Sequence, residues 1–119
     1  MKLILFVLAV TAVVSANEEA NVKSSRRSEL NLGFISFQDR LLLRRYVTRT
    51  SSSTSWSYFF WHQEPFGTRI TAIRARESGI SQSPTVRVFS GGVGFNTVNI
   101  EFRNAPGRGY RYQLEIWGR

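Results

Sequence analysis

The stretch TVRVFSGGVGFNTVNIEFRNAPGRGYRYQLEIW, residues 85–117, alternates apolar and polar side chains in three runs. The glycine-rich segments Gly91–Gly94 and Pro106–Gly109 separate these runs. A period of two bounded by Gly and Pro is typical of half-buried antiparallel strands. Matching apolar residues across each turn predicts two successive hairpins with one shared apolar face. That face consists of Val86, Val88, Val98, Ile100, Phe102, Tyr112, Leu114 and Ile116.

Four shorter runs upstream also favour strands, at residues 33–37, 40–49, 56–62 and 69–76. Residues 40–47 could instead form a short amphipathic helix, but the Tyr, Val and Thr at the end of this run favour a strand. The unbroken Ser/Thr run at residues 50–55 predicts a loop. We therefore expect an all-β fold, an antiparallel β-sandwich or flattened barrel of about seven strands. With no Cys in the chain, this fold has no disulfides.

Residues 1–16 have the pattern of a secretory signal peptide. Lys2 precedes an apolar run over residues 3–14, and small residues follow at positions 15 and 16. The run is too short to cross a bilayer of about 30 Å as a helix. The alternative is a buried N-terminal strand or helix. The pattern predicts a secreted, extracellular protein.

The remaining chain divides into two parts. Residues 17–31 are polar and lack periodicity, which predicts a flexible tail, and the pair Arg26-Arg27 within it is a candidate processing site. Residues 32–119 are expected to form a single β domain. No other apolar run is long enough for an anchor, so we expect no membrane association after removal of the signal peptide.

The charge balance is strongly basic. The formal net charge is +8, and it is +7 without Lys2 (8 − 1). Nearly all remaining cations are Arg, which contacts carboxylate, phosphate or sulfate groups in a bidentate manner. This composition favours a protein partner or a polyanionic one: a glycosaminoglycan, an acidic glycan or an acidic protein, with nucleic acid not excluded. The alternative is that the charge only maintains solubility.

Two groups of residues are candidates for binding. In the predicted register Arg103 faces Arg111 beside the turn that carries Arg108, and like charges in that position need an acidic neighbour or an anionic ligand. The alternative is a solvated basic tip. Phe89 and Trp117 fall together on the outer face, which predicts an interaction patch. Alternatively, residues 56–61 or the N-terminal segment cover these two aromatic rings.

The sequence offers little for catalysis. It contains one His and no Cys, and its carboxylates are scattered over separate strands and loops. No phosphate-binding loop or dinucleotide motif is present. We expect a non-enzymatic protein with no catalytic residues, cofactor or metal site.

Several motifs together resemble a known family. They are Gly33 followed by QDRL at 38–41, ITAI at 70–73, GGVG at 91–94, and the segment from Gly107 to Gly118 with its R-G-Y…I-W-G pattern. Their order and spacing are similar to those of the insect multiprotein bridging factor 2 family over about residues 32–118.

The resemblance implies two functions. The founding member of the family is described as a transcriptional coactivator that bridges a DNA-bound nuclear-receptor-type factor and the TATA-binding protein of the general transcription machinery. Most relatives carry signal peptides and resemble secreted haemolymph or salivary proteins. Because this chain begins with a signal-peptide pattern, we expect a small secreted binding protein, with the coactivator as the alternative.

Overall fold

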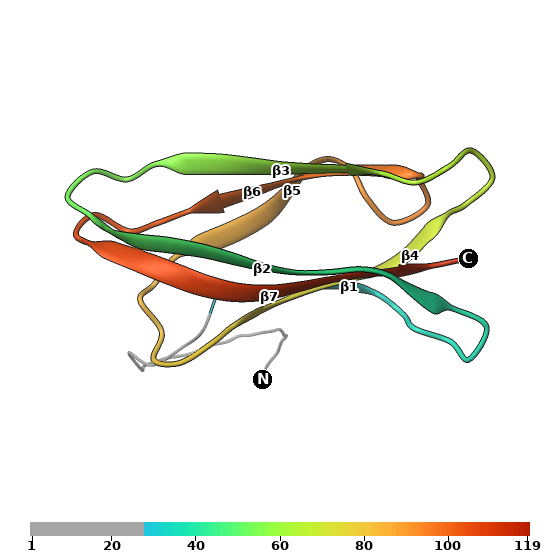
Figure 1. Cartoon of the computed structure of the whole chain (residues 1–119), viewed down its shortest axis with the longest axis horizontal. Coiled ribbons are helices and arrows are strands. Elements are labelled where there is room, and N and C mark those ends of the chain that lie inside the picture. Colours follow the sequence, from blue (N-terminus) through green and yellow to red (C-terminus); the bar gives the residue numbers. More distant parts are fainter. Residues whose placement is uncertain (1–27) are drawn as a thin grey trace, which may run out of the picture.

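The computed structural model describes residues 28–119, and seven strands form over this range with no helix. The strands are β1 (Leu30–Gly33), β2 (Arg40–Ser52), β3 (Ser57–Gln63), β4 (Ile70–Glu77), β5 (Thr85–Gly91), β6 (Thr97–Arg103) and β7 (Arg108–Gly118) (Figure 1). The all-β prediction and the expected number of strands are confirmed. The predicted signal peptide at 1–16, tail residues 17–27 and the Arg26-Arg27 pair lie outside the described residues.

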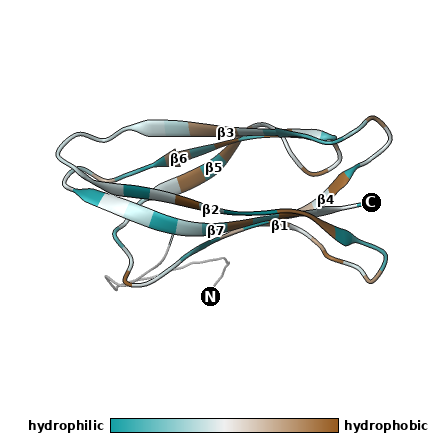
Figure 2. Cartoon of the chain, viewed as in Figure 1, coloured by the Kyte–Doolittle hydropathy of each residue, from teal (hydrophilic) through white to brown (hydrophobic). Residues whose placement is uncertain are grey.

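Two antiparallel sheets form the two layers of a sandwich (Figure 1). One sheet has four strands in the order β1-β4-β7-β2, and the other has three in the order β3-β6-β5. Hydrophobic and hydrophilic residues are interspersed along the strands (Figure 2), and the apolar side chains of both sheets gather in one core cluster. Within residues 28–119 no helix is long and apolar enough to cross a membrane.

The core lies between the sheets and contains the apolar face expected from the sequence. Six of its eight members are fully buried: Val98, Ile100, Phe102, Tyr112, Leu114 and Ile116. Val86 and Val88 are half-buried and pack against this cluster. The rings of Phe102 and Tyr112 lie 5.1 Å apart between their centroids, so the two layers meet through aromatic contact. The assignment of side chains to the core face is confirmed.

The predicted pairing of strands is partly wrong. β6 and β7 belong to different sheets, so the expected pairs between these two strands are not hydrogen-bonded neighbours. Their apolar side chains meet instead in the core cluster between the sheets, where Phe102 contacts Tyr112. β5 and β6 do form a hairpin, but Val86 pairs with Phe102 and Val88 with Ile100. This register is shifted by two residues from the predicted one. A shift of two leaves every side chain on its original face, which explains why the core was still correct.

The β5–β6 connection depends on a close approach of two backbones. Gly91 has a φ of 71°, and a Cβ atom on it would lie 2.3 Å from the carbonyl oxygen of Thr97. Only glycine fits this position without displacing the facing strand. A register irregularity between Val88 and Ser90 leaves Phe89 as an extra residue on β5.

The β6–β7 connection crosses from one sheet to the other and is held by Asn104, which is 1% exposed. The Asn104 side-chain amide donates to the carbonyl oxygens of Thr54, Ala105 and Arg108, at 3.1, 3.2 and 3.0 Å. Its Oδ1 accepts a hydrogen bond of 2.8 Å from the backbone N–H of Trp56. One side chain thus joins the β2–β3 and β6–β7 connections at the same end of the sandwich.

Two predicted boundaries also differ. Leu30 and Asn31, assigned to the flexible tail, pair with Ala75 and Arg74 as the first residues of β1. Leu30 packs against the core, and this contact explains the earlier start of the domain. β2 continues to Ser52 through part of the predicted loop, because an irregularity after Arg49 lets it keep pairing with β7.

Candidate anion-binding face

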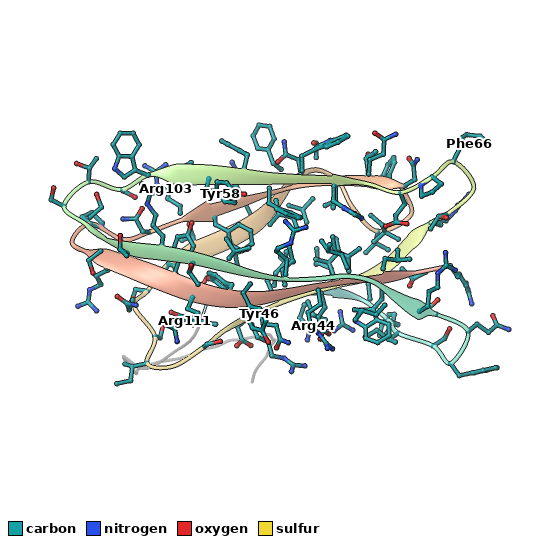
Figure 3. All side chains as sticks on the ribbon, viewed as in Figure 1. Arg44, Tyr46, Tyr58, Phe66, Arg103 and Arg111 are labelled. Atoms are coloured by element: carbon teal, nitrogen blue, oxygen red, sulfur yellow. The ribbon has the colours of Figure 1, made fainter. Side chains whose placement is uncertain are left out.

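The three arginines of the predicted tip do not form a common hairpin. Arg103 ends β6 in the three-stranded sheet, opposite Ser57 and Thr85, and its guanidinium donates to Ser57 Oγ at 2.9 Å. Arg111 lies in the four-stranded sheet, opposite Thr48 of β2. Figure 3 shows Arg103 and Arg111 in different layers. The predicted Arg103–Arg111 pair is therefore wrong, because residues 104–107 cross between sheets instead of turning within one.

Arg108 opens β7 opposite Ser52 and is exposed. Its backbone N–H donates to Ala105 at 3.0 Å in the turn that precedes the strand. Its side chain makes no ion pair with the residues that the structure describes. Arg108 is therefore an exposed cation without a carboxylate partner in the described part of the chain.

The two predicted patch aromatics also lie on different sheets. Phe89 is 54% exposed on β5, and its ring meets the ring of Phe59 edge-on at 5.1 Å. Trp117 is half-buried on β7, and its indole N–H donates to Glu115 Oε1 at 3.1 Å. The two residues cannot form one patch. Phe59 and Trp61 of β3 instead lie with Phe89 on the three-stranded sheet and are exposed. Residues 56–61 therefore do not form a layer that covers both Phe89 and Trp117.

A different basic surface emerges on the outer side of the four-stranded sheet. Strand pairing places Arg44 and Arg74 on either side of Glu115, and Arg76 beside Gln113. Arg111 follows on the same side of β7, two residues before Gln113. Glu115 is the one carboxylate on this side of β2, β4 and β7. We call this surface the basic face; it consists of Arg44, Arg74, Arg76 and Arg111.

Glu115 is fully engaged by its neighbours. Arg44 donates to Glu115 Oε2 from Nη2 at 2.7 Å and from Nε at 3.1 Å. Burial alone would raise the pKa of Glu115, but hydrogen bonds from Arg44 and Trp117, with the charges of Arg44 and Arg76, lower it. The carboxylate is thus ionised at neutral pH and neutralises one of the four cations.

The other cations of the basic face have no carboxylate partner among residues 28–119. Arg74 donates to the carbonyl oxygens of Leu32 at 2.6 Å and Gly33 at 3.1 Å, which holds its guanidinium across β1. These carbonyl contacts leave its charge in place. The side chains of Arg76 and Arg111 form no ion pair with any described residue. The basic face therefore carries a net charge of about +3 on three adjacent strands, which neighbour one another at about 4.8 Å.

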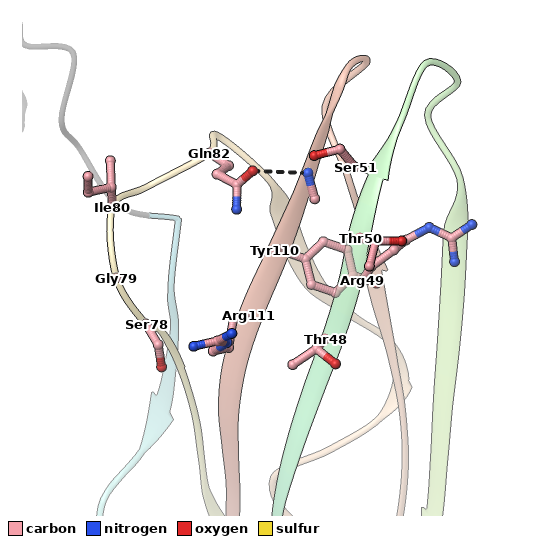
Figure 4. Close-up of a pocket in the computed structure, with 11 residues that line it drawn as sticks. Thr48, Arg49, Thr50, Ser51, Ser78, Gly79, Ile80, Gln82, Tyr110 and Arg111 are labelled. Carbon is pink, nitrogen blue, oxygen red and sulfur yellow. Dashed lines mark hydrogen bonds between the residues drawn. The ribbon is translucent and has the colours of Figure 1, made fainter.

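A hollow of about 720 Å³ opens at the Arg111 end of the basic face (Figure 4). Its polar groups include the hydroxyls of Thr48 and Ser78 on either side of the Arg111 guanidinium. Gln82 borders the hollow and accepts a hydrogen bond of 3.1 Å from the Gly109 N–H. A guanidinium among hydroxyl groups can bind an oxyanion or a sugar hydroxyl group. The sequence could not show this site, because strand pairing brings together segments more than 25 residues apart.

The structure also locates the titratable groups that were considered for catalysis. His62 Nε2 lies 2.7 Å from Glu64 Oε2 at the end of β3. Among residues 28–119, no group of three or more His, Cys, Asp or Glu residues is close enough to hold a metal ion.

Comparison with known proteins gives a family match. No curated protein and no solved structure shows significant similarity to this chain. A family sequence profile described as "Transcription activator MBF2" matches residues 32–118, which covers all strands except the first two residues of β1. The chain therefore belongs to the MBF2 family.

Proposed function

We propose that this protein is a small, secreted, non-enzymatic binding protein that holds a polyanionic partner on its basic face. The observation that supports this most directly is the clustering of four arginines around one carboxylate on an exposed sheet. The signal-peptide pattern of residues 1–16 supports secretion. Outside the cell, acidic glycans such as glycosaminoglycans are polyanions that such a face can bind.

The arrangement suits an extended ligand better than a compact one. Arg74 and Arg76 lie two residues apart on β4, so their side chains emerge about 7 Å apart along the strand. Arg44 adds a cation on β2, across the intervening β7. A chain with repeated sulfate or carboxylate groups can contact several of these guanidinium groups at once. The hollow beside Arg111 adds hydroxyl groups that can contact the sugar itself.

Heparin-affinity chromatography of the mature protein tests the proposal. The variant Arg76→Glu plus Arg111→Glu reverses two charges on the basic face, and we expect it to elute at clearly lower salt than the parent. Each charge-assisted hydrogen bond that is lost costs about 1.5–3 kcal/mol, or about tenfold or more in affinity.

The matched control is Arg69→Glu plus Arg103→Glu, which makes the same change in net charge at exposed positions away from the basic face. We expect this control to elute between the parent and the basic-face variant. Equal elution of the two double variants would show that only total charge matters, and the basic face would not be the binding site.

The family description supports a second candidate, a transcription activator. In that function the basic face would contact an acidic protein or nucleic acid inside the nucleus. A fluorescent fusion of the full chain separates the candidates: we expect it in the culture medium for a secreted protein. Accumulation in nuclei would support the activator and overturn secretion.

A further inference from the structure

The edge strands β2 and β3 lie on the same side of the sandwich, one in each layer (Figure 1). A second concave site lies between them. Each of these strands is paired on one side only among the described residues, because β2 ends the four-stranded sheet and β3 ends the three-stranded sheet. Between them is a groove of about 360 Å³. Its lining combines cations and aromatic rings: Arg45, Arg49, Tyr58, Phe60 and Tyr110.

Arg45 and Arg49 point toward the inside of the sandwich and not toward the basic face. They pair with Leu114 and Tyr110 of β7, whose side chains belong to the core. The Arg45 guanidinium lies 5.4 Å from the centre of the Phe60 ring, and that of Arg49 lies 6.0 Å from the ring of Trp56. These cation–π contacts hold both cations at the mouth of the groove.

Neither cation of the groove has an anionic partner within residues 28–119. Arg49 Nε is moreover shielded from solvent and has no hydrogen-bond partner among the same described residues. A buried donor without an acceptor is costly and calls for an explanation. Inward-pointing charges on an edge strand oppose edge-to-edge aggregation, but that role does not require a shielded Nε without an acceptor. An anionic ligand would supply the missing acceptor.

The aromatic residues of the groove provide flat apolar walls. Phe60 is buried on the side of β3 that faces the core. The Tyr58 ring is tilted against the Phe102 ring, with centroids 6.5 Å apart. Tyr110 stacks on Phe102 at 6.0 Å. Burial raises the pKa of Tyr110 more than the charge of Arg49 lowers it, so its hydroxyl is protonated at neutral pH.

We propose that this groove binds a small organic anion, with a carboxylate or sulfonate between Arg45 and Arg49 and a flat apolar body against Tyr58 and Phe60. The volume lies at the lower end of the range of small-molecule sites, about 300–1,000 Å³. The site is separate from the basic face, because Arg45 and Arg49 alternate along β2 with the outward-facing Arg44 and Thr48. It therefore stands independently of the proposed binding of a polyanion.

The probe is 1-anilinonaphthalene-8-sulfonate, which combines a sulfonate with a flat aromatic body. Titration of the folded protein, followed by fluorescence, is expected to show saturable binding at one site.

The variant Arg45→Gln plus Arg49→Gln should weaken binding at least tenfold, since both charge-assisted contacts are lost. The control Arg40→Gln plus Arg69→Gln removes two exposed cations outside the groove and should bind as the parent does. N-phenyl-1-naphthylamine, the same rings without the sulfonate, should bind weakly and equally to both variants.

Amide chemical shifts should change at Tyr58 and Phe60 when the probe binds. If the double variant does not fold, Arg49→Lys keeps the charge but loses the planar donor pair, and it should bind more weakly than the parent. If a groove variant folds and binds the sulfonate probe as tightly as the parent does, the proposal is wrong. It is also wrong if the parent protein shows no saturable binding of this probe. A third result would also overturn it: a glutamate-rich extended peptide displaces the probe and protects the β2 amides from hydrogen exchange. Equal heparin elution of the basic-face variant and its control would overturn only the proposed function, so the two ideas fail separately.

Discussion

Replacing Asn104 by Asp is expected to destabilise the fold strongly, although the two side chains have the same shape. The two N–H groups of the Asn104 amide serve three carbonyl oxygens, from Thr54, Ala105 and Arg108. An ionised carboxylate keeps the hydrogen bond from the Trp56 N–H but offers no donor to these carbonyls. The Ala105 carbonyl keeps the backbone N–H of Arg108 as a donor, so two carbonyls, those of Thr54 and Arg108, lose the Asn104 donor. At about 1–3 kcal/mol each, the loss is at least about 2 kcal/mol. That is a large part of the roughly 5–15 kcal/mol that stabilises a typical domain.

The effect of Asn104→Asp should depend on pH in a defined direction. Burial raises the pKa of the new carboxyl above its unfolded value of about 3.9. Below that value the protonated carboxyl can donate to one carbonyl, so the penalty is smallest there. It grows as pH rises and is complete above the folded-state pKa.

Urea unfolding at pH 3 and pH 7 measures both predictions for Asn104→Asp. Asn31→Asp is the matched control: it makes the same chemical change at an exposed position of β1, where surface substitutions usually change stability by less than about 0.5 kcal/mol. A loss of less than about 1 kcal/mol at pH 7, or an equal loss at both pH values, would refute the assigned role of Asn104 at the corner of the sandwich.

Two further predictions concern Glu115 and Gly91. Because contacts with Arg44 and Trp117 lower the pKa of Glu115, its ion pair adds stability above the unfolded pKa of about 4.3 and loses it as pH falls. Glu115→Gln should therefore lose less stability than the parent between pH 5 and pH 3 in urea unfolding, and parallel curves would contradict this. Gly91→Ala should cost about 2–3 kcal/mol in thermal unfolding, from positive φ and the clash with a facing carbonyl. Gly79→Ala, with a φ of 74° and open space around its Cβ, should cost less, and equal costs would show that the close approach is not limiting.

Much of the fold could be predicted because alternation identifies which side chains face the core. The eight residues expected inside from Val86 to Ile116 are all buried or half-buried. Alternation does not identify the neighbouring strand, however. A four-residue connection such as 104–107 can close a hairpin or cross between two sheets, and the apolar pattern is the same in both cases. The crossing here depends on hydrogen bonds from Asn104 to a distant loop.

The candidate site was harder to predict for the same reason. The basic face brings Arg44, Arg74 and Arg111 together from three strands that are far apart in the sequence. An irregularity between Leu41 and Leu43 also changes which side chains of β2 face inward, and it places Arg45 and Arg49 on the inner side. Sequence periodicity cannot anticipate such a bulge in a run of three leucines.

The strand order has a consequence for how the chain folds. β5 and β6 are the one pair of consecutive strands that are hydrogen-bonded among the seven, so the hairpin at Gly91 is the most local sheet structure. Every other pairing joins distant segments, with Arg40 meeting Gly118 across 78 residues. Such pairings form slowly, because long loops must close before the contacts can form. β7 lies between β2 and β4, so the four-stranded sheet cannot assemble before this last strand has been synthesised. Until then β2 keeps two unpaired edges, and its four arginines, which repel one another, protect it from premature association.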